Sequence, residues 1–297
     1  MKVHFDPGAL LRLVLLAGVS IGLAFLVGLL RDGSLSLSAV LTAGLIFCGV
    51  WLLILFIRLP FYSFVGMYRS AERLTSASLA IAEEEPEGKE YLFFQHSFFA
   101  YHLGNFSEAV HTLDKIDPAN VPDSLCAMVD LHRAIFLEAL FRSREAEEIL
   151  QNYDMDDYAG KALSLWQAYL ANAKAGLGLD LDMALCLAET AFARNPSAVI
   201  ATIMGHVLWR IEQYDAASSW FAYALRRMPR KERYFKSYTF FLQGRLLREL
   251  GKQEGASEAF ERALALAPSQ ECHDLYLKNW ESGSRRQSPR SGEARSV

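Results

Sequence analysis

The residues that could carry chemistry in this chain are its histidines, one acidic cluster and one serine motif. The seven histidines show neither H-x-x-x-H nor H-E-x-x-H spacing, which would place two imidazoles on one helix face for zinc. Asp154, Asp156 and Asp157 before Gly160 come close to a calcium-loop spacing, but Tyr158 stands at a ligand position and the glycine comes one residue late. These patterns predict neither a metal site nor a cofactor.

The serine motif lies in an apolar stretch. Residues 18–22 fit G-x-S-x-G, but a nucleophile at Ser20 needs a strand-turn-helix context, which an apolar helix does not provide. Gly18 and Gly22 also form G-x-x-x-G, which lets a second helix approach closely; the alternative is that they are simple membrane filler. With no phosphate-binding loop and no nucleophile-base pair, the sequence predicts a binding protein and no enzyme.

Two long apolar segments begin the chain. Residues 13–30 and 35–57 hold no charged side chain, and each is long enough to cross a bilayer core about 30 Å thick as a helix. The connection Arg31-Asp32-Gly33-Ser34 is short and polar. A signal peptide is the alternative for the first segment, but its apolar length and the second segment directly behind it favour an anchor. We therefore expect a transmembrane helical hairpin over residues 1–60.

The basic residues around this hairpin predict its orientation. Lys2 and Arg12 precede the first segment, and Arg58, Arg69 and Arg73 follow the second, whereas only one basic residue separates them. We expect both termini in the cytoplasm of a bacterial cell and the protein in its inner membrane. The four scattered cysteines, without a C-x-x-C pair, fit a reducing compartment.

Beyond the hairpin the chain has the charge balance of a soluble domain. Residues 58–297 hold 27 of the 30 basic and 32 of the 34 acidic side chains. A protein that binds nucleic acid through its phosphates normally shows a basic excess, so nucleic acid is not an expected partner.

The rest of the chain reads as helical. The segment 61–88 holds an amphipathic linker helix that ends before Glu83-Glu84-Glu85-Pro86, where charge and proline interrupt the pattern. From Lys89 onward the apolar spacing is helical throughout, with no sustained alternation of period two. We therefore predict an all-α protein.

Small residues, aromatic residues and prolines recur at fixed spacing in the helical part. The clearest unit has Phe240, Gly244, Leu247, Gly251, Ala256, Phe260, Ala263 and Pro268, and the unit before it has Met204, Gly205, Leu208, Ala217, Phe221, Ala224 and Pro229. Three weaker units precede these, with small-residue anchors at Ala109, Ala146 and Ala184. Gly205 should approach Ala217, and Gly244 should approach Ala256, so that the two helices of each unit pack closely.

This pattern resembles the tetratricopeptide repeat (TPR) family. The resemblance implies an α-solenoid of about five TPR units over residues 89–268. A capping helix at 269–280 and a disordered tail at 281–297 should follow it.

TPR arrays bind partners through the first helix of each unit, so the resemblance also implies a concave binding face rich in aromatic and arginine side chains. For each of these residues the alternative is packing between helices. The expected set is Tyr91, Phe94, Phe98, Tyr101, Trp166, Tyr169, His206, Trp209, Arg210, Tyr238, Phe241, Arg245 and Arg248.

The order of parts, a membrane hairpin followed by cytoplasmic TPRs, resembles the PelE-type inner-membrane protein of Pel exopolysaccharide biosynthesis. That resemblance implies a scaffold that binds other inner-membrane subunits. The HemY type, linked to porphyrin metabolism, has the same order of parts, but the strongly basic segment behind its second span is missing here. A membrane enzyme that uses TPRs for recruitment is a third possibility, which the lack of polar clusters inside the apolar segments disfavours.

Overall fold

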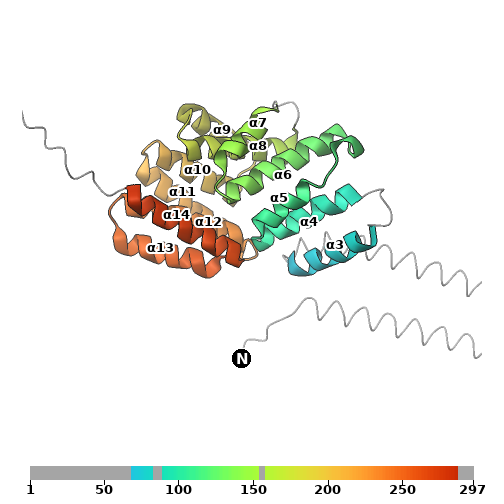
Figure 1. The fold of residues 1–297 in the computed structure, drawn as a ribbon. Helices are drawn as coiled ribbons and strands as arrows, with labels where there is room; N and C mark the ends of the chain where they lie inside the picture. The colour runs from blue at the N-terminus through green and yellow to red at the C-terminus, as the bar shows by residue number, and fades with distance from the viewer. Residues whose placement is uncertain (1–67, 83–88, 154–157, 287–297) are drawn as a thin grey trace, which may run out of the picture. The chain divides into compact units, whose positions relative to one another are not determined.

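The computed structural model describes residues 68–82, 89–153 and 158–286, which form twelve α-helices, one short 3-10 helix and no strand (Figure 1). The chain divides into a unit of residues 1–60 and a unit of residues 61–297, and all described residues belong to the second. The expected hairpin with Gly18 and Gly22 and the acidic cluster at 154–157 lie outside the described residues. Within the described ranges, no helix combines the length and the hydropathy that a bilayer crossing requires.

The helices form five consecutive pairs, with one helix before them and one after. The leading helix is α3 (Tyr68–Ala82) and the closing helix is α14 (Gln270–Arg286). The pairs are α4 (Lys89–Leu103) with α5 (Phe106–Leu113), α6 (Asp123–Ala139) with α7 (Ser143–Gln151), α8 (Gly160–Leu177) with α9 (Leu181–Arg194), α10 (Ala198–Arg210) with α11 (Tyr214–Arg227), and α12 (Arg233–Glu249) with α13 (Gln253–Leu266). A 3-10 helix at Pro118–Asn120 lies between the first two pairs.

The closing helix is longer than the sequence predicted. It begins near the expected position but continues past Trp280 to Arg286, so the first part of the predicted disordered tail is helical. Residues 287–297 lie outside the described part of the chain.

All five pairs turn in the same way. One residue in each turn has a left-handed backbone, with φ of +84° at Gly104, +60° at Phe141, +72° at Gly178, +64° at Glu212 and +73° at Gly251. The N–H of the next residue then donates to the carbonyl five positions earlier, at 2.9 Å in every turn. This is the Schellman ending of a helix, and its fivefold recurrence shows five equivalent helix pairs.

Small residues let the helices of a pair pack closely, as the sequence predicted. The five anchor alanines on the second helices, Ala109, Ala146, Ala184, Ala217 and Ala256, are all fully buried. A Cβ atom added at Gly205 would lie 3.2 Å from the carbonyl oxygen of Ala217, and one at Gly244 would lie 3.2 Å from that of Ala256. The predicted close contacts between these residues are therefore confirmed.

The first helices of the pairs lie on the inner side of the solenoid and the second helices on its outer side. Neighbouring first helices contact one another from α6 through α8 and α10 to α12. Aromatic side chains fill the space between them, including Tyr101, Tyr169, Tyr234 and Phe241, all of them buried. The centre of the solenoid is therefore a packed core over much of its length.

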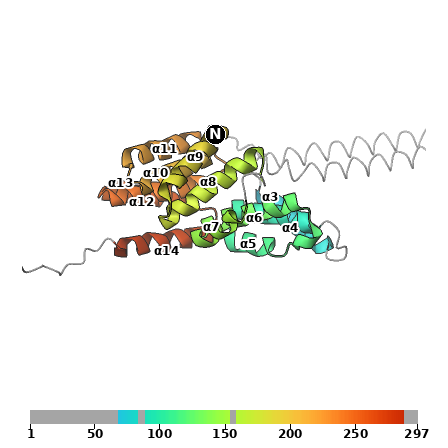
Figure 2. The same ribbon diagram turned by 90° about the horizontal axis from the view of Figure 1, so that it is seen from above.

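The two ends of the array meet. The ring of Tyr234 on α12 lies 5.2 Å from that of Tyr101 on α4 and 4.8 Å from that of Phe106 on α5, measured between centroids. The backbone N–H and the hydroxyl of Ser107 donate to Oε1 of Glu271 on α14, at 3.0 and 2.6 Å. Both ribbon views show α14 beside α5 (Figures 1 and 2). The sequence had not predicted this contact.

Helix α3 packs onto α4 and extends the array at its beginning. Ala71 and Thr75 are buried on its inner face, and the Thr75 hydroxyl lies 3.2 Å from Nδ1 of His96.

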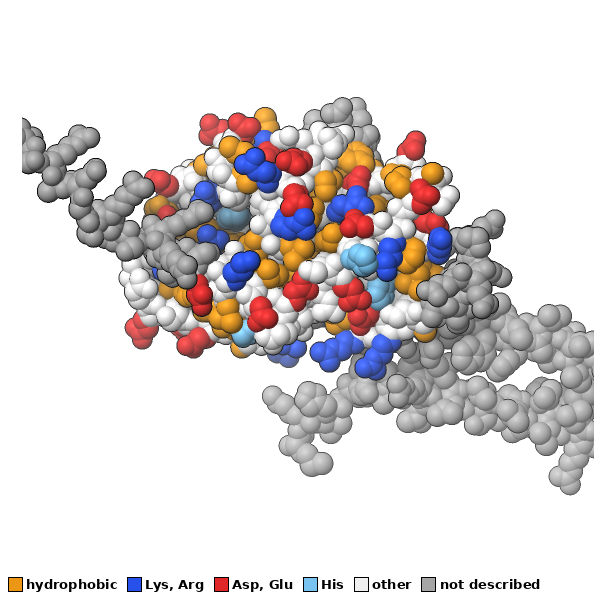
Figure 3. Space-filling view, viewed as in Figure 1, with side chains coloured by type: hydrophobic (Ala, Val, Ile, Leu, Met, Phe, Trp, Pro, Cys, Tyr) orange, Lys and Arg blue, Asp and Glu red, His pale blue; other side chains and the backbone are white. Residues whose placement is uncertain are grey.

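The surface of the solenoid has no single charged patch on the face seen in Figure 3. Acidic and basic side chains are interspersed there instead of gathering in one patch of either sign.

Candidate functional site

Two pockets lie along the first helices, separated by packed side chains. One, the polar pocket, has a volume of about 290 Å³ and lies toward the carboxyl ends of α6, α8 and α10. The other, the aromatic pocket, has about 490 Å³ and lies toward the amino ends of α10 and α12. Between them, Ile135, Tyr169, Thr202 and Tyr234 leave a gap of only about 10 Å³. The solenoid therefore offers two chemically different sites.

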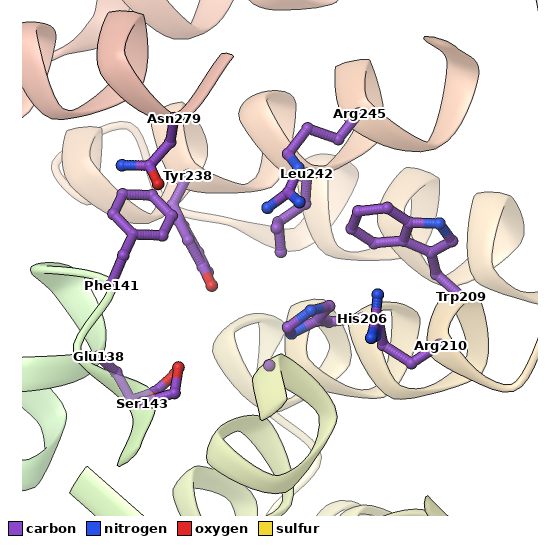
Figure 4. Close-up of a pocket in the computed structure, with 11 residues that line it drawn as sticks. Glu138, Phe141, Ser143, His206, Trp209, Arg210, Tyr238, Leu242, Arg245 and Asn279 are labelled. Carbon is purple, nitrogen blue, oxygen red and sulfur yellow. The ribbon is translucent and has the colours of Figure 1, made fainter. Parts of the chain in front are cut away.

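Four helix pairs and α14 contribute to the polar pocket (Figure 4). Glu138 and Ser143 lie on one side of it, Trp209, Arg210 and Arg245 on the other, and the Tyr238 side chain points between them. The full lining is Glu138, Phe141, Ser143, Gly176, His206, Trp209, Arg210, Tyr238, Leu242, Arg245 and Asn279.

A chain of buried hydrogen bonds forms one wall of the polar pocket. The amide nitrogen of Asn172 donates to Oε2 of Glu138, and its Oδ1 lies 2.8 Å from Nδ1 of His206. Because this amide oxygen can only accept, Nδ1 of the imidazole carries the proton and Nε2 is unprotonated. The chain fixes the Glu138 carboxyl and the His206 ring in place.

Both titratable ends of this chain favour their neutral forms. Burial raises the pKa of Glu138 to about 7, although hydrogen bonds from Ser143 and Asn172 act in the opposite direction. Burial lowers the pKa of His206 to about 3, and the positive charges of Arg245 and Arg210 lower it further. The wall therefore carries little charge at mildly acidic pH.

The opposite wall is cationic. The Arg245 guanidinium lies over the ring of Trp209, with 5.1 Å between Cζ and the ring centroid, and 5.8 Å from that of Phe241. Burial lowers the pKa of Arg245, and the like charges of Arg248 and Arg210 act in the same direction. Nε of Arg210 donates to the carbonyl oxygen of Ala175 at 2.9 Å, which directs this second guanidinium to the same region. An anion is the complementary ligand.

Phe141 is a strained residue at the rim of this pocket. It occupies a left-handed turn position that glycine fills in three of the five pairs, and a non-glycine residue there costs about 1–2 kcal/mol. Its ring lies 5.5 Å from that of Phe241 and 6.4 Å from that of Tyr276. These contacts with α12 and α14 hold the second pair against the last one and so fix the pocket wall.

The aromatic pocket is lined mostly by rings and aliphatic side chains. Phe98 and His102 enter from α4, His132 and Phe136 from α6, and Phe235 from α12. The full lining is Phe98, Tyr101, His102, His132, Ile135, Phe136, Leu165, Tyr169, Asn195, Ser197, Ala198, Val199, Arg227, Met228, Pro229, Glu232 and Phe235. Such a cavity suits apolar side chains of a ligand.

Helix α3 helps to shape one edge of the aromatic pocket. The Tyr68 ring stacks on the His102 imidazole with 4.3 Å between centroids, and its hydroxyl donates to Oε1 of Glu232 at 3.4 Å. Burial lowers the pKa of His102 to about 3, so this imidazole is neutral at physiological pH. Burial also raises the pKa of Glu232.

The structure distributes the predicted binding residues over several environments. His206, Trp209, Arg210, Tyr238 and Arg245 line the polar pocket, and Phe98, Tyr101 and Tyr169 line the aromatic pocket.

The other five predicted residues line neither of these two pockets. Tyr91 is 57% exposed on α4, and Phe94 packs edge-on against His132. Trp166 donates to the Leu150 carbonyl, Phe241 is buried against Tyr276, and Arg248 donates to the Trp280 carbonyl.

Several lining residues were missing from the sequence-based set. Glu138 follows Leu131, Ala134 and Ile135 on the apolar face of α6, so a carboxyl at that helical spacing was a detectable signal. Asn172, which supports the polar pocket through Glu138 and His206 without lining it, was missed as well and lies in the buried alanine-rich stretch of α8. His102 and His132 had no spacing that marked them, because their neighbours come from other helices.

Comparison with known proteins supports the repeat assignment. Residues 238–270 match the family model of the tetratricopeptide repeat, a segment that covers most of α12 and all of α13. The other four pairs have the same turn geometry, so the described part of the chain is an α-solenoid of helix pairs, and its last pair matches the tetratricopeptide repeat. No curated protein sequence matches the chain.

Solved structures with similar folds include a Rap protein in complex with competence and sporulation factor. It is 14% identical, with 89% of this chain and 80% of that chain covered, at a TM-score of 0.58. YrrB, described as a TPR protein with an unusual peptide-binding site, is 17% identical over 68% of this chain and 96% of its own, at a TM-score of 0.36. MamA MSR-1 is 19% identical over 60% and 96%, at 0.35. The first of these likenesses shows the solenoid fold.

Proposed function

We propose that this protein is a scaffold that holds a protein partner in the aromatic pocket and assembles or regulates an inner-membrane complex. The observation that carries the proposal is the pocket itself, a cavity of about 490 Å³ lined by rings and aliphatic side chains where α4, α6, α10 and α12 come together. A solenoid that holds no ligand would be expected to fill this space with its own side chains. Partner segments place their large apolar side chains in cavities of this kind.

The lining specifies the chemistry of the partner. Phe98, Phe235 and Val199 offer an apolar surface, while Arg227 and Glu232 supply one charge of each sign. An apolar helix or extended segment of a protein, flanked by polar residues, fits this surface. The Rap protein of similar fold was solved with its factor bound, which shows for that protein that a solenoid of this type can hold a ligand.

The membrane part of the proposal rests on the sequence of residues 1–60. Two uncharged segments, joined by a short polar connection of four residues and flanked by Lys2, Arg12 and Arg58, support a hairpin anchor with a cytoplasmic array. The order of parts further supports a role in exopolysaccharide synthesis or export of the Pel type, where the partner is another inner-membrane subunit.

Filling the aromatic pocket tests this function. Val199→Trp places an indole in the cavity without removing a core side chain, and Met183→Trp places the same indole on the outer helix α9, where Met183 is 53% exposed. Truncation of an interface anchor costs about 2 kcal/mol or more, which is a loss of roughly thirtyfold in affinity. We expect a loss of that size when the Val199→Trp full-length chain is used to recover its partner from membranes, and none for Met183→Trp.

The identity of the recovered protein and the fold of the variant decide the result. Circular dichroism has to show normal helix content for both variants. Undiminished partner recovery by a folded Val199→Trp chain would place the docking surface elsewhere. A partner from porphyrin metabolism would overturn the exopolysaccharide assignment and favour the HemY type.

A further inference from the structure

The polar pocket holds more positive charge than its own side chains balance. Arg210 and Arg245 both line it, whereas its one carboxyl, Glu138, is mostly protonated below neutral pH. Among the described residues, no carboxylate forms an ion pair with either guanidinium. The nearest acidic side chain along α12, that of Glu249, accepts instead from Nε1 of Trp209 at 2.8 Å and from the Tyr214 hydroxyl at 3.3 Å.

The electrostatic effect of this excess is visible on neighbouring groups. Besides burial, the charges of Arg245 and Arg210 both lower the pKa of His206. Burial is also the largest cause of the lowered pKa of Arg245; Arg248 and Arg210 lower this pKa further, while Tyr238 and Glu249 act in the opposite direction without reversing the shift. A partly buried charge normally has a counter-charge or strong hydrogen-bond acceptors, because removing it from water is costly. The lining therefore lacks a negative group between its two guanidinium groups.

Ring stacking alone does not explain Arg245. Three other arginines of the described chain also lie over aromatic rings. Arg227 lies over Tyr223 at an exposed position, where water can solvate its charge, and the other two each have an acceptor. Arg262 lies over Phe240 and pairs with Oε1 of Glu258 at 2.6 Å, and Arg248 lies over Trp280 and donates to its carbonyl at 2.7 Å. Arg245 has ring faces on one side and the pocket on the other (Figure 4).

We propose that the polar pocket binds a small organic acid, whose carboxylate bridges Arg210 and Arg245 and whose far end hydrogen-bonds to Glu138 and Tyr238. This site is separate from the aromatic pocket, and the proposal does not depend on partner docking there. Guanidinium groups match the planar geometry of a carboxylate and bind it through charge-assisted hydrogen bonds.

The shape of the site limits the size of the ligand. Its volume of about 290 Å³ is at the lower end of the roughly 300–1,000 Å³ usual for small-molecule sites. A short dicarboxylic acid or an amino acid fits such a space. Across the pocket from the guanidinium groups, the protonated carboxyl of Glu138 can donate a hydrogen bond, and the Ser143 and Tyr238 hydroxyl groups can donate or accept.

Calorimetric titration of the full-length chain with glutarate tests the proposal. We use a pH of about 6, where the Glu138 carboxyl with its pKa of about 7 is protonated. Glutaramide, the uncharged diamide of the same length, is the ligand control. Glutarate should bind and glutaramide should not. Loss of a hydrogen bond to a charged group costs about 1.5–3 kcal/mol, so Arg245→Gln and Arg210→Gln should each weaken glutarate binding about tenfold to a hundredfold.

Arg262→Gln is the matched protein control, because it removes a ring-stacked arginine outside the pocket. It should leave glutarate binding unchanged. Arg210 is exposed, whereas Arg245 is partly buried, so Arg210→Gln should disturb folding less than Arg245→Gln and still tests the proposal if Arg245→Gln unfolds at a lower temperature. Absence of glutarate binding up to millimolar concentration would overturn the proposal, as would equal binding by all three variants.

A further comparison distinguishes two sources of the carboxylate, a small acid and the chain end of a protein. It uses a tripeptide with a free terminal carboxylate and the same tripeptide with an amidated end. Glutarate binding that depends on Arg210 and Arg245 supports a small acid as the ligand. Binding of the tripeptide carboxylate without glutarate binding would assign the site to the chain end of a protein and overturn the small-acid proposal.

Discussion

Glu138 is an acidic residue in an environment that disfavours its charged form. A carboxyl on the inner face of α6 lies among apolar side chains, where its charged form loses the solvation that water gives it. Asn172 compensates in part by donating a hydrogen bond to it. Because this compensation is incomplete, the cost of ionising Glu138 must appear in the stability of the protein.

The sign of that cost follows from the two pKa values. Below the ordinary value of 4.5 the carboxyl is protonated in both the folded and the unfolded chain, and its contribution to stability is fully present. As the pH rises from 4.5 to about 7, the unfolded chain releases the proton while the folded chain keeps it, so stability is lost. Above about pH 7 the loss is complete.

We therefore expect Glu138→Gln to stabilise the protein at pH 8 and to have little effect at pH 4.5. One pKa unit corresponds to about 1.4 kcal/mol, so the gain at pH 8 should be about 1–3 kcal/mol in the free energy of unfolding. Urea unfolding at several pH values measures it. Glu148→Gln, at an exposed position of α7, is the control and should show no such pH dependence. A parallel pH profile for the two variants would contradict the assignment.

At the scale of helices, local spacing predicted the packing within each pair and little beyond it. The contact of Gly205 with Ala217 is set by residues of two adjacent helices joined by a short turn, so a fixed sequence distance records it. The Phe141 turn was harder to predict, because an aromatic residue occupies the position where glycine marks the turn in other pairs.

The pockets were predictable only in part, and for a physical reason. An aromatic residue on a first helix has the same spacing whether it lines a groove or fills the core. Trp209 and Phe241 both fit the expected binding face, yet Trp209 lines a pocket and Phe241 is buried against Tyr276. The difference depends on small rotations between successive pairs, and no short motif records those.

Close packing within a pair predicts opposite effects of the same substitution at two helical glycines. In Gly205→Ala the added methyl group would lie 2.7 Å from Cε1 of Phe221 and 3.2 Å from the Ala217 carbonyl oxygen, so the helices must separate. Such overpacking costs about 1–3 kcal/mol. In Gly255→Ala the nearest atom is Cδ1 of Leu247 at 3.5 Å, an ordinary contact, and better helix propensity should stabilise α13 by up to about 1 kcal/mol.

Thermal unfolding of the two glycine variants checks this prediction. Melting temperatures that shift in opposite directions support the close contact of α10 with α11. A Gly205→Ala chain that melts with or above the parent protein would show that this interface has room for the methyl group.

For the solenoid as a whole, the contact between its ends changes how stability is distributed. In an open repeat array each unit contacts only its neighbours, and terminal units open first. Here the hydroxyl of Ser269, in the connection between α13 and α14, donates to the Gly104 carbonyl at 2.7 Å, although 165 residues separate them in sequence. Tyr234 and Phe106 add ring contacts at the same interface. The first pair therefore supports the last, and both pockets have walls braced from two sides.

This closure predicts a larger effect at Gly104 than at an equivalent turn. Gly104→Ala and Gly251→Ala both put a methyl group on a left-handed residue, with φ of +84° and +73°, at a cost of about 1–2 kcal/mol each. An added Cβ at Gly251 meets nothing within 4 Å, whereas at Gly104 it would lie 2.7 Å from Cγ of Pro268 and 2.8 Å from Oγ of Ser269. Gly104→Ala should therefore cost about 1–3 kcal/mol more than Gly251→Ala in urea unfolding, because it also forces the two ends apart. Hydrogen exchange should show the loss of protection in α5 and at the start of α14 together, since the same contact holds both. Equal losses of stability in the two variants would mean that the first and last pairs do not touch in solution, and the solenoid would then behave as an open array.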